Sequence, residues 1–128
     1  MNIVLVMIGG FFGALCRYGL GEWVQTENGF PFGTLLVNII GCFALGWFLT
    51  YMKQKQKQKA EVTLLLGTGF IGSFTTFSTF SVETIELLQQ GQIMLASIYV
   101  LSSILLGLLV AFAGSKWAVY DRKEGKTV

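Results

Sequence analysis

The stretch that decides the fold runs from Gly67 to Glu83 and reads GTGFIGSFTTFSTFSVE. It lies inside an apolar segment that begins near Val62, and three of its first six residues are glycines. Its second half places phenylalanines three residues apart, with Ser or Thr at most positions between them. The interior of a membrane offers no water to hydroxyl groups. This density of hydroxyls therefore predicts either a water- or ion-lined path or a helix that is broken and buried in protein.

The composition of the chain predicts residence in a lipid bilayer. The 128 residues are enough for one domain, 1–128, and they are 53% hydrophobic but only 12% charged. Soluble domains usually carry about 25% charged residues. The chain contains no His, which removes the commonest general base and metal ligand. No basic face is mixed with base-stacking aromatics, so nucleic acid is not an expected partner.

Apolar segments separated by short polar ones predict an all-α membrane protein. We expect four transmembrane helices, at about residues 3–20, 33–52, 62–88 and 93–117. The remaining polar segments are a cationic loop and a charged tail, at 53–61 and 120–128.

Glycines mark where these helices can approach one another or break. Gly9 and Gly13 form a Gly-x-x-x-Gly pair, which allows another helix to pack closely. The third span is longer than the roughly 20 residues that one crossing needs. Its glycines and hydroxyls predict two half-helices with a break near Gly72 to Thr76. Gly67 to Gly72 also matches GxGxxG, but no strand–helix alternation surrounds it, so we reject a dinucleotide site.

Basic residues are distributed unevenly along the chain. Four spans place both termini on one side of the membrane, and 8 of the 9 basic residues fall on that side. The positive-inside rule then predicts a plasma-membrane protein with both termini in the cytoplasm. The eight residues are Lys53, Lys55, Lys57, Lys59, Lys116, Arg122, Lys123 and Lys126.

Several polar or aromatic side chains have two possible roles each. Asn38 either bonds a neighbouring helix or presents N–H donors to an anion. Arg17 is either an interfacial anchor or an electropositive funnel at a pore mouth. Glu83 is expected to accept hydrogen bonds from the hydroxyls that precede it. Phe77 and Phe80 either pack against other helices or turn their positive ring edges toward an anion.

The run from Gly72 to Glu83, Gly-x-x-Thr-Thr-Phe-Ser-Thr-Phe-Ser-x-Glu, strongly resembles the CrcB/Fluc family of fluoride channels. The resemblance extends to Gly13 and Arg17 in the first span and to Pro-x-Gly-Thr-Leu-x-Val-Asn, residues 31–38. The order and spacing of these motifs fit over the whole chain. One departure is Gly72-Ser73-Phe74, where other members often have Gly-Gly-Leu.

The resemblance implies a fluoride-selective channel built as a small antiparallel dimer with two pores. It assigns Phe77, Phe80 and Asn38 to the fluoride path. It also implies a structural sodium ion, not transported, at the break between the subunits, held by the backbone carbonyls of Gly72 and Thr75. We further assign these polar side chains to the path: Thr34, Thr76, Ser78, Thr79, Ser81, Tyr99 and Ser103, with Arg17 in the vestibule and Glu83 at the end of the polar track.

The charge bias leads to a hypothesis about the partner. A homodimer whose subunits insert in both orientations needs a weak charge bias, whereas this chain has a strong one. We therefore expect a second, related subunit inserted the opposite way. The alternative function is a small dual-topology, proton-coupled multidrug exporter, which would need a carboxylate deep in a span. We expect no enzyme activity, because the sequence shows no nucleophile–base pair and no metal cluster.

Overall fold

Helices make up nearly all of the computed structural model, which describes residues 2–24, 29–54 and 60–124. The first two spans are α1 (Asn2–Trp23) and α2 (Phe32–Gln54), and the last is α6 (Ile93–Glu124). The third span is a series of four pieces: α3 (Ala60–Val62), the π-helix η1 (Thr63–Ile71), α4 (Gly72–Phe74) and α5 (Phe77–Gln89). Within the described residues, four helical segments are long and apolar enough to cross a membrane, as predicted.

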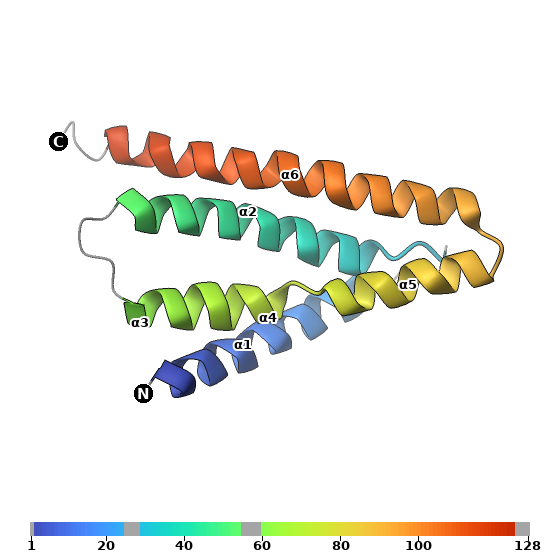
Figure 1. The fold of residues 1–128 in the computed structure, drawn as a ribbon, viewed down its shortest axis with the longest axis horizontal. Helices are drawn as coiled ribbons and strands as arrows, with labels where there is room; N and C mark the ends of the chain where they lie inside the picture. The colour runs from blue at the N-terminus through green and yellow to red at the C-terminus, as the bar shows by residue number, and fades with distance from the viewer. Residues whose placement is uncertain (1, 25–28, 55–59, 125–128) are drawn as a thin grey trace.

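The ends of the chain lie at the same end of the bundle, and the short α5–α6 turn lies at the other (Figure 1). Gly91 in this turn has a φ of 75°, in the left-handed region that glycine adopts without strain. Most of the predicted cationic loop, residues 55–59, lies outside the described residues. The helix α6 continues to Glu124, so the first residues of the predicted charged tail are helical. Lys, Arg and Glu are good helix formers, so the helix extends past its apolar stretch.

Two pairs of helices form the bundle, α2 against α6 and α1 against η1 and α4. The Gly-x-x-x-Gly pair of α1 lies at the second contact, as predicted. A Cβ at Gly9 would overlap the carbonyl oxygen of Leu65, and one at Gly13 would overlap that of Phe70. Gly46 and Gly114 have the same role between α2 and α6. Small residues therefore bring the backbones together in both pairs.

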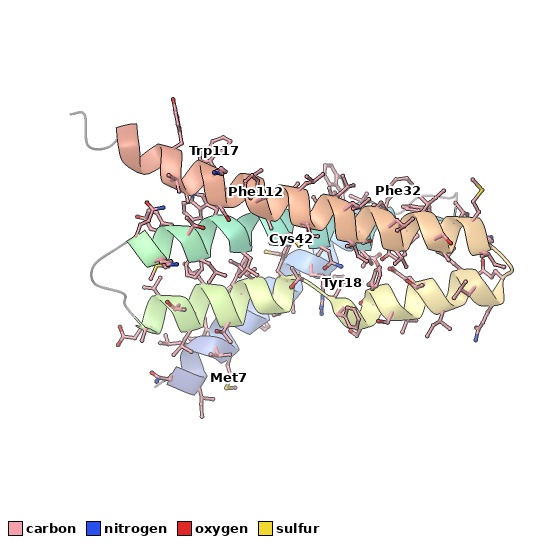
Figure 2. The ribbon with its side chains drawn as sticks, turned by 45° about the horizontal axis from the view of Figure 1, so that its top comes forward. Met7, Tyr18, Phe32, Cys42, Phe112 and Trp117 are labelled. Atoms are coloured by element: carbon pink, nitrogen blue, oxygen red, sulfur yellow. The ribbon has the colours of Figure 1, made fainter. Side chains whose placement is uncertain are left out.

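Apolar side chains cover the outside of the bundle. Figure 2 shows Met7, Phe112 and Trp117 pointing away from it, and each is more than 60% exposed. A soluble protein rarely exposes so much contiguous apolar surface. This surface fits a lipid environment, in agreement with the composition.

The third span is interrupted at two residues inside the predicted interval. Thr75 (φ −76°, ψ 154°) and Thr76 (φ −144°, ψ 121°) are extended, and helical geometry resumes at Phe77. The interruption bends the span only slightly (Figure 1). The π-helix before it was not predicted. It widens the turn of the backbone where the span packs on α1.

Candidate functional site

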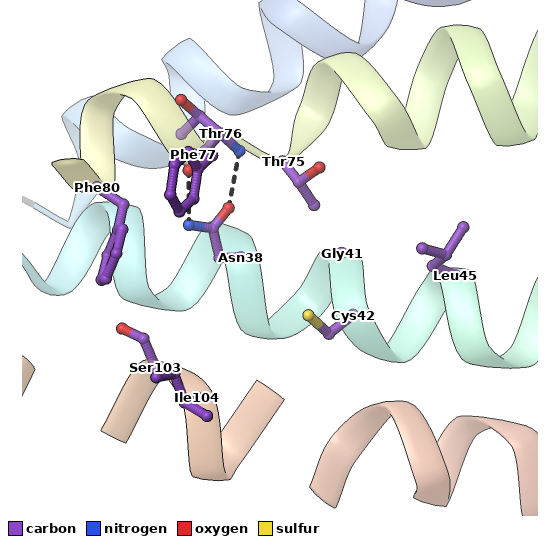
Figure 3. Close-up of a pocket in the computed structure, with 10 residues that line it drawn as sticks. All are labelled: Asn38, Gly41, Cys42, Leu45, Thr75, Thr76, Phe77, Phe80, Ser103 and Ile104. Carbon is purple, nitrogen blue, oxygen red and sulfur yellow. Dashed lines mark hydrogen bonds between the residues drawn. The ribbon is translucent and has the colours of Figure 1, made fainter. Parts of the chain in front are cut away.

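The extended residues are held by a side chain from another span. Asn38 of α2 donates from Nδ2 to the carbonyl oxygen of Thr76 at 2.9 Å and accepts from the Thr76 N–H at 2.8 Å (Figure 3). The interhelical role considered for Asn38 is therefore present. One of its two N–H bonds is used in this way.

The Thr76 hydroxyl caps the N-terminus of α5. It accepts from the Thr79 N–H at 3.2 Å and lies 2.9 Å from the Thr79 hydroxyl and 3.3 Å from that of Ser78. This is the usual N-cap of a helix. The Ser81 hydroxyl instead donates to the Phe77 carbonyl of its own helix at 2.9 Å, the ordinary alternative for a membrane hydroxyl. The predicted row of hydroxyls thus consists of a hydrogen-bonded cluster, Thr76, Ser78 and Thr79, and of Ser81, which lies apart from it.

A cavity of about 330 Å³ lies beside the break. Phe77 and Phe80 form one wall, with ring centroids 5.8 Å apart and planes tilted by 36°. Phe77 is 79% exposed, so its ring stands at the surface of the single chain. Among the described residues, the buried Ser103 hydroxyl has no hydrogen-bond partner. The lining residues are Asn38, Gly41, Cys42, Leu45, Thr75, Thr76, Phe77, Phe80, Ser103 and Ile104 (Figure 3).

Four of these lining residues were not predicted: Gly41, Cys42, Leu45 and Ile104. Cys42 follows Asn38 by four residues, and residues four apart share one helix face. The four-residue spacing from Asn38 would therefore have predicted Cys42 as a lining residue. Gly41 has a different role, because a Cβ there would overlap the methyl group of Thr75.

Glu83 gathers hydroxyls from two other spans. Thr34 of α2 donates to one carboxylate oxygen at 2.7 Å, and Tyr99 of α6 donates to the other at 2.6 Å. Tyr99 is fully buried, and its ring lies 5.0 Å from that of Phe80. The expectation that Glu83 accepts from hydroxyls holds, but these donors come from α2 and α6 rather than from the preceding residues. The preceding hydroxyls have other partners: the Thr79 hydroxyl lies 2.9 Å from that of Thr76, and the Ser81 hydroxyl donates to the Phe77 carbonyl.

Arg17 lines a second cavity, of about 140 Å³, together with Thr34, Thr76 and Thr79. A third cavity, of about 430 Å³, contains Glu83 and shares Thr34 with the second. Thr76 in turn lines both the second cavity and the one beside the phenylalanines. The second cavity therefore shares a lining residue with each of the other two.

Two backbone carbonyls at the break lose their usual helical partners. In a continuous helix, the Gly72 carbonyl would accept from the Thr76 N–H, and the Thr75 carbonyl from the Thr79 N–H. The Thr76 N–H bonds Asn38 instead, and the Thr79 N–H bonds the Thr76 hydroxyl. No three His, Cys, Asp or Glu gather among the described residues. The helical donors of the Gly72 and Thr75 carbonyls are thus engaged elsewhere.

Known proteins resemble this chain over nearly its whole length. The family model described as CrcB-like protein, Camphor Resistance (CrcB), matches residues 4–115. A protein of Oceanobacillus iheyensis named fluoride-specific ion channel FluC is 54% identical over 123 residues, which cover 96% of this chain and 95% of the relative.

Two more distant relatives carry similar names. Fluoride-specific ion channel FluC 2 of Geobacillus kaustophilus is 43% identical over 127 residues and 98% of both chains. Fluoride-specific ion channel FluC of Rhizobium etli is 42% identical over 116 residues, 89% of this chain and 93% of the relative. With four membrane-spanning segments and a match to the family model over most of its length, the chain belongs to the CrcB family of non-enzymatic membrane transport proteins.

Proposed function

We propose that this protein is a fluoride-selective channel that lowers cytoplasmic fluoride by passive export. The observation that carries the proposal is the cavity beside the break, where Asn38, the unpartnered Ser103 hydroxyl and the rings of Phe77 and Phe80 meet. The names of the relatives support the same ion. An ion moves through such a site without any covalent step, so the protein needs no catalytic residues.

The chemistry of the cavity suits a small anion. Fluoride must exchange its tightly held water for other donors, and it must leave again. The second N–H of Asn38, the hydroxyl of Ser103 and the positive edges of Phe77 and Phe80 offer several weak donors instead of one strong cation. A fully charged Arg or Lys at this point would hold the ion too tightly for conduction.

The three neighbouring cavities, which share Thr34 and Thr76, mark the route that we propose for the ion. In our proposal, the ion enters near Arg17, whose positive charge attracts anions. It then passes Thr34 and the hydroxyls of Thr76 and Thr79 before it reaches the phenylalanines. Ser78, whose hydroxyl lies 3.3 Å from that of Thr76, extends the hydroxyl side of this route, whereas Ser81 is bonded to the Phe77 carbonyl and lies apart from it. Tyr99 and Thr34 occupy the oxygens of Glu83 with hydrogen bonds, which reduces its repulsion of a passing anion.

We further propose that the carbonyl oxygens of Gly72 and Thr75 hold a structural sodium ion. These two oxygens suit sodium for two reasons. Both have lost their helical partners, and uncharged oxygens are suitable ligands for a hard monovalent cation. Two carbonyls are too few to enclose an ion. A second subunit that contributes the same two would complete the shell, so the sodium proposal requires the dimer. The ion would lock the two interrupted spans together and would not be transported.

The partner in this proposal is a subunit of opposite orientation, so that the assembly is an antiparallel dimer with two pores. The 79% exposure of Phe77 supports a partner, since a ring that lines a pore needs a facing wall. Lys53 is in the last turn of α2, and Lys116 is in the C-terminal third of α6. The C-terminal ends of these two helices lie at the end of the bundle that holds both termini (Figure 1), which we place in the cytoplasm of the cell. One preferred orientation favours a second, related chain as the partner.

The multidrug exporter is not favoured. Such an exporter needs a carboxylate that exchanges protons against a cationic drug. Both oxygens of Glu83 instead accept hydrogen bonds from Thr34 and Tyr99. The relatives are named for fluoride and not for drugs.

Anion flux from liposomes tests the function. The purified protein, alone and together with a related second chain, is reconstituted in vesicles loaded with fluoride or chloride. We expect rapid fluoride release and little chloride release, without a proton gradient. Equal release of both halides would refute selectivity, and full flux from this chain alone as a symmetric dimer would refute the second subunit.

A further inference from the structure

Ser73 stands immediately before the interruption and reaches a neighbouring span. Its hydroxyl donates to the backbone carbonyl oxygen of Gly10 in α1 at 2.6 Å. The contact joins residues 63 positions apart in the chain. The close approach of α1 is set by Gly9 and Gly13, where a Cβ would overlap the carbonyl oxygens of Leu65 and Phe70. A Cβ at Gly10 itself would lie 4.0 Å from the Ser73 Cβ, which is ordinary contact.

The segment that contains Ser73 is the last helical turn before the break. The helix α4 has only three residues, and it lies between a π-helix and two extended residues. On its upstream side, the Gly72 N–H is shared between the carbonyls of Gly67 and Gly69. On its downstream side, the Thr76 N–H bonds Asn38 instead of α4. The Thr75 N–H still bonds the Ile71 carbonyl at 3.1 Å, so helical hydrogen bonding continues to Thr75 and stops there. At this helix end, contacts with other spans add to the helical bonds that orient the Gly72 and Thr75 carbonyls.

Contacts from two directions are present. On the α2 side, Asn38 binds Thr76, and the methyl group of Thr75 packs against Gly41. On the α1 side, the hydrogen bond from Ser73 is the polar contact, and it lies between the two carbonyls in sequence. A break held on one side alone could rotate about the chain axis, whereas one held on both sides cannot.

We infer that Ser73 is a positioning residue, which orients the carbonyls of Gly72 and Thr75 for a cation through its hydrogen bond to Gly10. The inference rests on the proposed sodium site. It predicts that loss of the hydroxyl weakens sodium binding while the bundle still folds. A serine that only joined two helices would lower stability equally with and without sodium.

The chain offers a matched control. The Ser115 hydroxyl donates to Ala111 at 3.0 Å and reaches the Gly46 carbonyl of α2 at 3.4 Å. It is thus another serine with an interhelical bond to a glycine carbonyl, but it lies in the α2–α6 contact, away from the break. Ser115→Ala removes the same atoms as Ser73→Ala.

In the experiment, the melting temperature of the purified full-length protein is measured at increasing sodium concentration. Choline replaces sodium to keep the ionic strength constant. The partner chain is present if the protein requires one. Because one hydrogen bond is removed, we expect Ser73→Ala to raise the sodium midpoint about five- to tenfold. Ser115→Ala should leave the midpoint unchanged, and Ser73→Thr, which keeps the hydroxyl, should restore it. If Ser73→Ala fails to fold, Ser73→Cys replaces it, because a thiol of similar shape is a poor donor.

The outcomes separate the inference from the function. Equal sodium midpoints for Ser73→Ala and Ser115→Ala would overturn the inference, and so would a wild-type melting temperature that does not respond to sodium. Fluoride flux is measured on the same samples. Absent flux from a wild-type protein that still binds sodium would refute the channel proposal alone.

Discussion

The two halves of the third span differ in what their backbone and side chains contact. In the upstream half, Thr63–Phe74, glycine and carbonyl groups pack directly on α1, and a Cβ at Gly69 would crowd the Val6 carbonyl. In the downstream half, Phe77–Gln89, the hydroxyls of Ser78 and Thr79 and the ring of Phe77 are exposed. One half therefore supports the break, and the other presents chemical groups to an ion or a partner.

This difference teaches that one continuous apolar segment can carry two roles when its helix is interrupted. In the upstream half, glycines leave no side chain between the two helices, so their backbones come into contact. Downstream, the new N-terminus at Thr76 frees side chains to point away from the bundle. Substitutions upstream should therefore change assembly, whereas substitutions downstream should change flux at constant assembly.

The largest effect is expected where α1 meets the upstream half. Gly9→Ala would place a methyl group on the Leu65 carbonyl oxygen, which is backbone and cannot turn aside. We expect a loss of roughly 3 kcal/mol or more, enough to abolish a monodisperse peak after detergent extraction. Gly19→Ala is the control, since nothing lies within 4 Å of its Cβ position. A stable Gly9→Ala protein would contradict the proposed support role of this half.

The next effect is expected at the junction. Asn38→Ala leaves the N–H and the carbonyl of Thr76 without their partners. Each unpaired group costs about 1–3 kcal/mol, so both stability and flux should fall, with flux reduced at least about tenfold. Thermal unfolding and liposome flux measure the two effects. Loss of stability with unchanged fluoride flux would limit Asn38 to a structural role.

The downstream rings should affect flux alone. Phe77→Ile and Phe80→Ile keep apolar volume but remove the positive ring edge. We expect fluoride flux to drop about tenfold, the equivalent of about 1.4 kcal/mol, with the same elution profile. Phe112→Ile, a similarly exposed ring on the outside of α6, serves as the control. Equal flux in all three variants would remove the rings from the mechanism.

The smallest effect is expected at Ser103, and it has opposite signs in two measurements. Ser103→Ala removes a buried hydroxyl that has no partner among the described residues, so stability should stay equal or rise by up to about 1 kcal/mol. Fluoride flux should fall a few-fold because one donor is lost. Ser102→Ala is the neighbouring control, since that hydroxyl is already bonded to the Tyr99 carbonyl. Reduced stability in Ser103→Ala would contradict a free hydroxyl.

Much of the fold was predictable because it depends on local composition. Apolar length predicted four spans, and Gly9 with Gly13 predicted a close helix contact. The hydroxyl-rich run after the glycines predicted the break within a few residues. The predicted fourth span, to about residue 117, did not give the end of α6 at Glu124, because hydropathy marks the edge of the membrane and not the end of a helix. The π-helix had no sequence signal that we recognised.

The candidate site was predictable as a set of residues but not as an arrangement. The motif singled out Asn38, Phe77 and Phe80, yet it did not reveal that Asn38 replaces the helical bonds of Thr76. Nor did it reveal that Thr34 and Tyr99 both bond Glu83. These contacts join spans that are far apart in the chain. Local sequence patterns do not indicate which helix faces pack against one another.

The sequence by itself determined that the chain crosses a bilayer four times, where its third helix breaks, and which polar groups accompany the break. The reason is that the cost of burying polar groups in hydrocarbon acts on each segment separately. Only the tertiary structure decided which of those groups are satisfied and which remain free. Asn38 holds the backbone and Ser73 reaches α1, while the Ser103 hydroxyl faces the cavity, because partners are chosen by packing between helices and not along them.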